Sequence, residues 1–143
     1  MKIFTIGFTK TSAEHFFSRL KRSGATKIID VRLNNVSQLA GFAKRDDLRY
    51  FASAICGMQY EHLPVLAPTQ SMLDGFKKKG GAWDSYAEQF TALIRERRIE
   101  TLDPARLDGA CLLCSEDKPH ACHRRLVAEY LSEQWQSVKI VHL

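Results

Sequence analysis

Short apolar runs alternate with stretches of helical spacing along this chain. The apolar runs predict five strands, over residues 2–6, 27–31, 59–63, 110–114 and 138–141. Between them, apolar residues recur every three or four positions, which predicts helices over 11–24, 46–55, 83–98 and 121–134, with a shorter one from 68. Local signals predict a capping box that begins at Thr11, a helix end at Gly24, and a cap at Asp46 or Asp47. The alternation predicts a single α/β domain over residues 1–143, with a mostly parallel sheet of four to five strands and helices on both faces.

Two polar segments interrupt this pattern. The residues from 32 to about 46 show no clear period and include side chains typical of loops: Asn34, Asn35, Ser37, Gln38 and Gly41. This loop leaves the carboxyl end of a predicted parallel strand, where ligands of open α/β sheets bind. The second segment, Lys77 to Gly81, is predicted to form a basic turn that ends in glycine.

Charge and composition narrow the class of partner. The 143 residues carry a formal net charge of +5, which favours small anionic ligands, nucleotides or nucleic acid. No apolar stretch is as long as a membrane-spanning helix, and no signal-peptide pattern precedes the first strand. We therefore expect a cytoplasmic protein without membrane contact, whose four cysteines are reduced. The pattern indicates neither a cofactor nor an oligomeric state.

The densest chemistry lies at a predicted strand-to-helix junction, residues 114–125. The first turn of the helix offers unpaired backbone N–H groups and the positive end of its dipole, so it can bind an anion with help from Arg124. The same dipole should stabilise a thiolate at Cys122 and keep His123 neutral, which suits a nucleophile beside a base. The alternative is that Cys122 only packs and His123 only hydrogen-bonds a carbonyl.

The junction can also be interpreted as a metal site. Cys114, Cys122 and His123, with His120 nearby, can supply ligands of the kind that zinc prefers. However, the spacing of these cysteines is not that of a zinc finger, and Cys111 and Cys114 should face opposite sides of a strand. We therefore assign no metal ligand at this point, and we place Cys114 with Glu116 among the ligand-binding residues.

A second group of candidates lies at the ends of two other predicted strands. Asp30 is near the carboxyl end of its strand and Arg32 enters the loop, so Arg32 can face a ligand while Asp30 orients it or acts as a base. A structural ion pair that holds the loop is an equal alternative. By strand alternation, Tyr60 and His62 share one face, where they can supply a stacking ring and an imidazole. The alternative is a partly buried strand whose polar side-chain ends are satisfied within the protein.

Two weaker signals complete the candidate site. Phe42 can cover a ligand from a turn, and Gly7 can bring backbone N–H groups near an anion, although no full glycine-rich fingerprint surrounds it. Three functions stay open: an enzyme acting on a phosphorylated or nucleotide-like substrate, a non-catalytic nucleic-acid or nucleotide-binding module, and a metal-binding protein. The enzyme hypothesis assigns catalysis to Cys122, His123, Asp30 and His62, and ligand contacts to Arg32, Arg124, Phe42, Tyr60, Gly7, Cys114 and Glu116.

Several short motifs occur in a recognisable order: Thr5-Ile6-Gly7, Asp30-Val31-Arg32, Gly41-Phe42, His62-Leu63-Pro64, Leu113-Cys114 and Cys122-His123-Arg124. In these motifs the chain resembles the family called domain of unknown function 488, from about Lys2 to its last residue. The resemblance implies a small bacterial or archaeal α/β protein without an established reaction. Many members have a histidine after the Thr-Ile-Gly step, where this chain has Phe8, so the resemblance implies no role for that imidazole here.

Overall fold

A parallel sheet forms the middle layer of the protein in the computed structural model, which describes residues 1–36 and 40–143. Within these residues the sheet has five strands: β1 (Lys2–Gly7), β2 (Lys27–Asp30), β3 (Gln59–His62), β4 (Ala110–Cys114) and β5 (Lys139–His142). Their order is β3-β2-β4-β1-β5, and each neighbouring pair is parallel. The predicted fold class is confirmed, and β4 takes the central position between β2 and β1.

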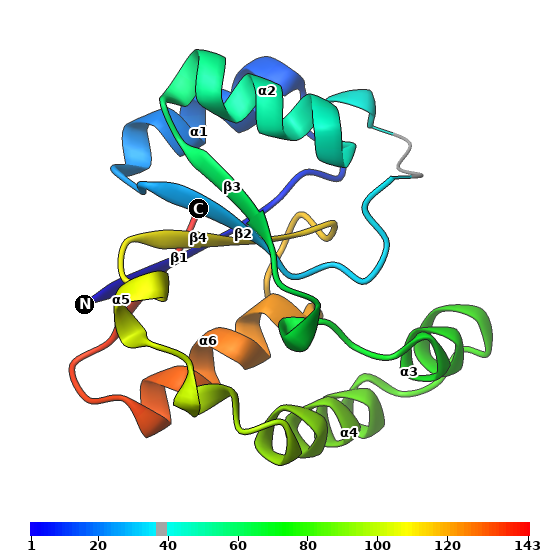
Figure 1. Ribbon diagram of the computed structural model, residues 1–143. Coiled ribbons are helices and arrows are strands. Elements are labelled where there is room, and N and C mark those ends of the chain that lie inside the picture. Colours follow the sequence, from blue (N-terminus) through cyan, green and yellow to red (C-terminus); the bar gives the residue numbers. More distant parts are fainter. Residues whose placement is uncertain (37–39) are drawn as a thin grey trace.

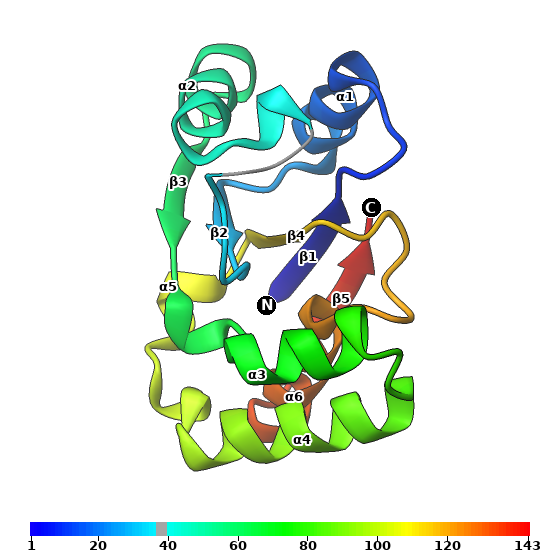
Figure 2. The same cartoon turned by 90° about the vertical axis from the view of Figure 1, so that its right-hand side faces the viewer.

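Helices cover both faces of the sheet, as expected for this class (Figure 1). One layer holds α1 (Ala13–Ser23) and α2 (Arg45–Cys56), and the other holds α4 (Trp83–Glu96) and α6 (His123–Gln134) (Figure 2). Shorter segments are α3 (Gln70–Leu73), α5 (Pro104–Leu107), a π-helical turn at Asp74–Lys78, and 3-10 turns at Gly41–Ala43, Pro64–Leu66 and Ile99–Thr101. None of the helices in the described part of the chain has the length and apolar character needed to cross a membrane.

The central strand β4 separates two hydrophobic cores. Cys111 packs into the core beneath α1 and α2, whereas Cys114 packs into the core beneath α4 and α6. The two side chains therefore face opposite sides of the sheet, as strand alternation predicted. All five residues of β4 are buried, which agrees with the apolar run that predicted a strand covered on both faces.

Helix ends follow local signals, with two differences from the sequence prediction. Ser12, rather than Thr11, caps α1 by accepting the N–H of the third residue after it. Gly24 ends this helix in the left-handed conformation, with a φ of 82°, as predicted. Asp46 and Asp47 lie inside the first turn of α2, where a negative charge favours the positive end of the helix dipole, instead of capping it.

The loop predictions had mixed outcomes. The predicted basic turn at Lys77 to Gly81 is wrong at its start, because Lys77 and Lys78 belong to the π-helical turn that extends α3. The loop predictions at Ser37 and Gln38 lie outside the described residues.

Candidate functional site

The carboxyl ends of the central strands carry most of the predicted site residues. Strand β2 ends at Asp30, strand β4 ends at Cys114, and α6 begins directly after Cys122. The two motifs that the sequence pointed to are in contact at this edge, because Nε2 of His123 lies 2.7 Å from the carbonyl oxygen of Val31. This is the edge at which open parallel sheets bind ligands.

A buried ion pair joins Asp30 and Arg32. The Asp30 side chain is inaccessible to solvent, and its carboxylate accepts hydrogen bonds from Arg32 Nε at 2.9 Å and Nη2 at 2.8 Å. It also accepts the backbone N–H of Arg32 at 3.1 Å and the Tyr60 hydroxyl at 2.5 Å. Because both carboxylate oxygens are engaged, the geometry favours Asp30 as the group that orients Arg32 over Asp30 as a general base.

Arg32 retains one guanidinium nitrogen that could bind a ligand. Its Nη2 also donates to the carbonyl of Ala43 at 2.8 Å, but the buried Nη1 has no hydrogen-bond partner among the residues that the structure describes. The guanidinium lies over the ring of Phe8, 5.1 Å from its centroid. Arg32 lines a cavity of about 180 Å³, together with Leu33, Asn34, Pro68, Leu73, Cys114, Ser115 and His123.

Tyr60 and His62 lie beside this ion pair and support it. Nε2 of His62 is 2.6 Å from the carbonyl oxygen of Arg32. A carbonyl oxygen only accepts, so this nitrogen carries the proton and the ring holds the loop in place. Burial and the neighbouring Asp30 carboxylate raise the pKa of Tyr60 far above its ordinary value, so its hydroxyl remains a donor.

Cys114, Cys122 and His123 form a compact buried cluster where β4 ends and α6 begins. Their ligand atoms, two thiol sulfurs and a ring nitrogen, all lie within 4.8 Å of one another. Sγ of Cys114 is 3.6 Å from Nδ1 of His123. The carbonyl of Val31 requires the proton on Nε2, so Nδ1 of a neutral His123 ring presents its lone pair to the thiols.

The thiolate is favoured at Cys114, not at Cys122. A hydrogen bond from Cys122 lowers the pKa of Cys114, against the effect of burial, and Ser115 and the charge of Arg124 add to the lowering. Burial, followed by the interaction with Cys114, raises the pKa of Cys122. The sequence argument considered only the helix dipole at Cys122, and it missed Ser115, whose position directly after a buried parallel strand was the available signal.

The cluster suits two kinds of chemistry. A thiol next to an imidazole nitrogen that accepts its proton is the arrangement of a nucleophile with its base. Two thiols and an imidazole are also a ligand set for a soft metal ion.

Arg124 lies deeper than the sequence suggested. Its side chain is completely buried, and Nη1 donates to the backbone carbonyl of Glu116 at 2.5 Å. Nε and Nη2 have no partner within the described residues. The Glu116 carboxylate forms an ion pair with Lys77. Arg124 therefore adds positive potential beneath the junction, while its one hydrogen bond anchors the loop that follows β4.

The N–H groups after Gly7 are engaged within the protein. Those of Phe8 and Thr9 donate to the carbonyl of Ser115, at 3.2 and 2.9 Å. A Cβ on Gly7 would lie 1.5 Å from the carbonyl oxygen of Glu116, so this glycine permits close contact between two backbone segments. The structure therefore uses Gly7 for packing where we expected backbone donors for an anion.

Phe42 packs with other aromatic rings instead of standing free above the cavity. Its centroid lies 5.3 Å from that of Phe16, 5.8 Å from that of Phe17 and 6.4 Å from that of Phe8. These residues belong to the core beneath α1 and α2, where Phe42 is a partly buried member. The contacts fit a role in core packing.

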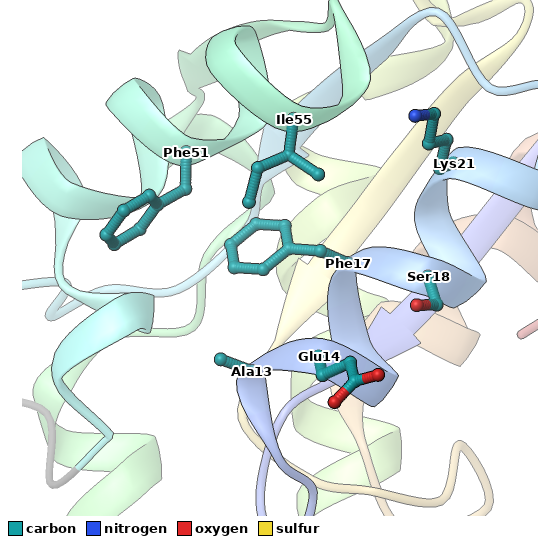
Figure 3. A pocket seen from close by; sticks show the side chains of 7 residues that line it. All are labelled: Ala13, Glu14, Phe17, Ser18, Lys21, Phe51 and Ile55. Carbon is teal, nitrogen blue, oxygen red and sulfur yellow. The ribbon is translucent and has the colours of Figure 1, made fainter.

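An apolar groove lies on the face of the sheet that α1 and α2 cover, apart from the cluster of Cys114, Cys122 and His123. It measures about 380 Å³ and runs between α1 and α2, where Phe17 faces Phe51 and Ile55, with Glu14 and Lys21 nearby (Figure 3). Cys114 and Cys122 pack into the core on the other face of the sheet. None of the predicted site residues lines this groove, so it is not part of the candidate site.

Comparison with known proteins adds one finding. A family model described as "Domain of unknown function DUF488" matches residues 12–131, a span that includes Asp30, Arg32 and the whole Cys114 cluster. No curated protein and no solved structure matches the chain.

Proposed function

We propose that this protein, which belongs to the DUF488 family, is an enzyme acting on a phosphorylated or nucleotide-like anionic substrate. One observation carries the proposal: the buried Arg32 is oriented by Asp30, and its Nη1 has no partner among the described residues. Buried donors in folded proteins are nearly always satisfied, so this nitrogen is available to a partner from outside the chain. An anion is the partner that a guanidinium binds best.

The size of the cavity supports a small anionic group. At about 180 Å³, it is smaller than the several hundred cubic ångströms that usually enclose a complete organic ligand. It can hold a phosphate group, with the remainder of the substrate outside. The Asp30 contacts keep the guanidinium in one orientation, so little side-chain entropy is lost when the anion binds.

Reactive groups border the same cavity. Cys114 and His123 line it with Arg32, so an anion held by Arg32 would lie next to a thiol and an imidazole. In this proposal Arg32 binds substrate, and Cys114 and His123 act on it. Asp30 and His62 are positioning residues, because each binds Arg32.

A nucleic-acid-binding function has less support. Trp83, an aromatic side chain of a kind that can stack on bases, packs instead against Phe76 and Tyr86 and lies under the guanidinium of Arg125. The net charge of +5 alone does not distinguish a polymer from a small anion.

Arg32→Lys is expected to weaken binding of inorganic phosphate and of AMP roughly tenfold or more. A lysine can still pair with Asp30, but its single ammonium group lacks the additional guanidinium N–H donors that would bind the anion. Isothermal titration calorimetry measures the affinity for each anion, and thermal melting curves verify that the variant is folded. Arg97→Lys is the matched control. Arg97 donates to the carbonyls of Val65 and Ala67 and is not among the described residues that line the cavity, so its variant should bind like wild type.

Equal phosphate affinity in the Arg32 and Arg97 variants would contradict the proposal. Binding of RNA or DNA that weakens steeply with salt, without binding of either small anion, would instead support the nucleic-acid module.

A further inference from the structure

Two thiols and an imidazole converge beside the proposed anion site, close enough together to hold one metal ion, and one sulfur–nitrogen distance among them equals that of a tetrahedral centre. Zinc lies about 2.3 Å from a thiolate and 2.0–2.1 Å from an imidazole nitrogen, so tetrahedral angles place sulfur and nitrogen about 3.6 Å apart and two sulfurs about 3.8 Å apart. The Cys114 Sγ to His123 Nδ1 distance is 3.6 Å, and the whole set spans no more than 4.8 Å. We propose that Cys114, Cys122 and His123 bind one zinc ion.

The carbonyl of Val31 prepares His123 for this role. It accepts the Nε2 proton at 2.7 Å, which fixes the tautomer and leaves Nδ1 as the free lone pair toward the thiols. Metal-binding histidines commonly donate their second nitrogen to such an acceptor, which orients the ring. The ring of Phe90 also packs against that of His123, with centroids 5.2 Å apart. The imidazole is therefore held in a ligating orientation before metal arrives.

Charge balance permits a metal in this enclosure. All three residues are buried, with exposures of 5%, 3% and 5% for Cys114, Cys122 and His123. Two thiolates neutralise Zn²⁺, so the complete centre carries no net charge, and burying a neutral group costs far less than burying an ion. Binding would release the two thiol protons to solvent.

The positions of the ligands in the fold explain how two cysteines without zinc-finger spacing can share one metal ion. Seven residues separate the two cysteines, which is unlike a zinc finger. Here Cys114 ends β4, whereas Cys122 and His123 open α6, so the sheet and the helix bring the ligands together and no tight finger turn is needed. A bound zinc would clamp both ends of the loop at 115–121.

Three protein ligands leave the fourth position open, the pattern of catalytic zinc sites. The three residues line a cavity of about 40 Å³, enough for a water molecule, and two of them also line the larger cavity with Arg32. A substrate oxygen could thus reach the metal while Arg32 holds the anionic group, and Cys114 and His123 would then act on the substrate as ligands of the metal, instead of as a nucleophile and its base. Only this last step rests on the proposed function; metal binding does not require it.

The wild-type chain provides the first test. Protein purified without chelators or an affinity metal should contain about one equivalent of zinc by elemental analysis, since such centres bind tightly. After removal of the metal, titration with Co²⁺ should give thiolate-to-cobalt absorption and the visible bands of a tetrahedral site, saturating at one equivalent. Less than about one-tenth equivalent of zinc with no cobalt spectrum would overturn the inference.

Ligand variants provide the second test. Cys114→Ser, Cys122→Ser and His123→Ala are each expected to weaken zinc binding at least about 100-fold, as loss of a direct ligand should cost more than loss of a supporting contact. Cys111→Ser is the matched control, because Cys111 is buried on the same strand but faces the other core. Retention of zinc by the three ligand variants, or equal loss in the control, would refute the site. If these variants fail to fold, the cobalt spectrum of the wild type decides the question.

The anion variant separates this inference from the proposed function. Arg32→Lys should keep its full zinc content while it loses phosphate affinity, since Arg32 is not one of the three ligands. A wild-type protein that binds phosphate through Arg32 but takes up neither zinc nor cobalt would refute the metal centre alone.

Discussion

Asp30→Ala is expected to lower the free energy of unfolding by about 3–5 kcal/mol, because it leaves Arg32 as a buried cation without its partner. Asp30 and Arg32 are 0% and 4% exposed, so the pair is shielded from bulk water. The Tyr60 hydroxyl loses its acceptor as well. Urea denaturation followed by circular dichroism measures the change.

Two comparisons isolate the charge effect. The double variant Asp30→Ala with Arg32→Met should recover at least half of the loss, because removing both charges leaves none unpaired. Asp46→Ala is the surface control. Its ion pair with Arg45 is solvent-exposed, so we expect only a small loss of stability, from its place near the positive end of the α2 dipole. If Asp30→Ala unfolds at the same urea concentration as Asp46→Ala, the buried pair does not hold this loop.

The elements of the fold were largely predictable from local pattern. The apolar run at Ala110–Cys114 indicated a strand buried on both faces, and the structure places it at the centre of the sheet. The order of the strands was not predictable, because each pairing depends on how connecting helices pack. The basic turn predicted for Lys77 to Gly81 was misplaced at its start. Lys77 and Lys78 continue a helical segment there, where their charges and Gly80 suggested a turn.

The candidate site was predictable in place but not in detail. Parallel strands end at one edge, which is a reason for Asp30-Val31-Arg32 to meet Cys122-His123-Arg124, and the contact between His123 and Val31 shows that the two motifs do meet. Which cysteine favours its thiolate depends on contacts that spacing does not reveal. Cys122 is the N-cap of α6, yet burial and the interaction with Cys114 raise its pKa. The pKa of Cys114 is lowered, because its sulfur accepts hydrogen bonds from Cys122 and Ser115.

Gly7→Ala is expected to destabilise the protein by about 3 kcal/mol or more, at the upper end for an overpacked position. The new methyl carbon would lie 1.5 Å from the carbonyl oxygen of Glu116 and 3.0 Å from Nη1 of Arg124. A backbone carbonyl cannot relieve this overlap by changing rotamer, as a flexible side chain can. The loop after β4 must therefore move away from β1, and the N–H donors of Phe8 and Thr9 would lose the Ser115 carbonyl. Chemical denaturation measures the loss.

Gly75→Ala is the control for this prediction, because a Cβ there meets no atom within 4 Å and its backbone is not left-handed. Its stability should stay within about 0.5 kcal/mol of wild type. The loop displaced in Gly7→Ala joins Cys114 to Cys122, so the folded fraction of that variant should also bind zinc less tightly, whereas Gly75→Ala should not. Equal stability of the two variants would mean that the loop does not approach β1 so closely. Loss of stability with unchanged zinc affinity would mean that the loop contact and the metal ligands are independent, and that Gly7 serves the fold alone.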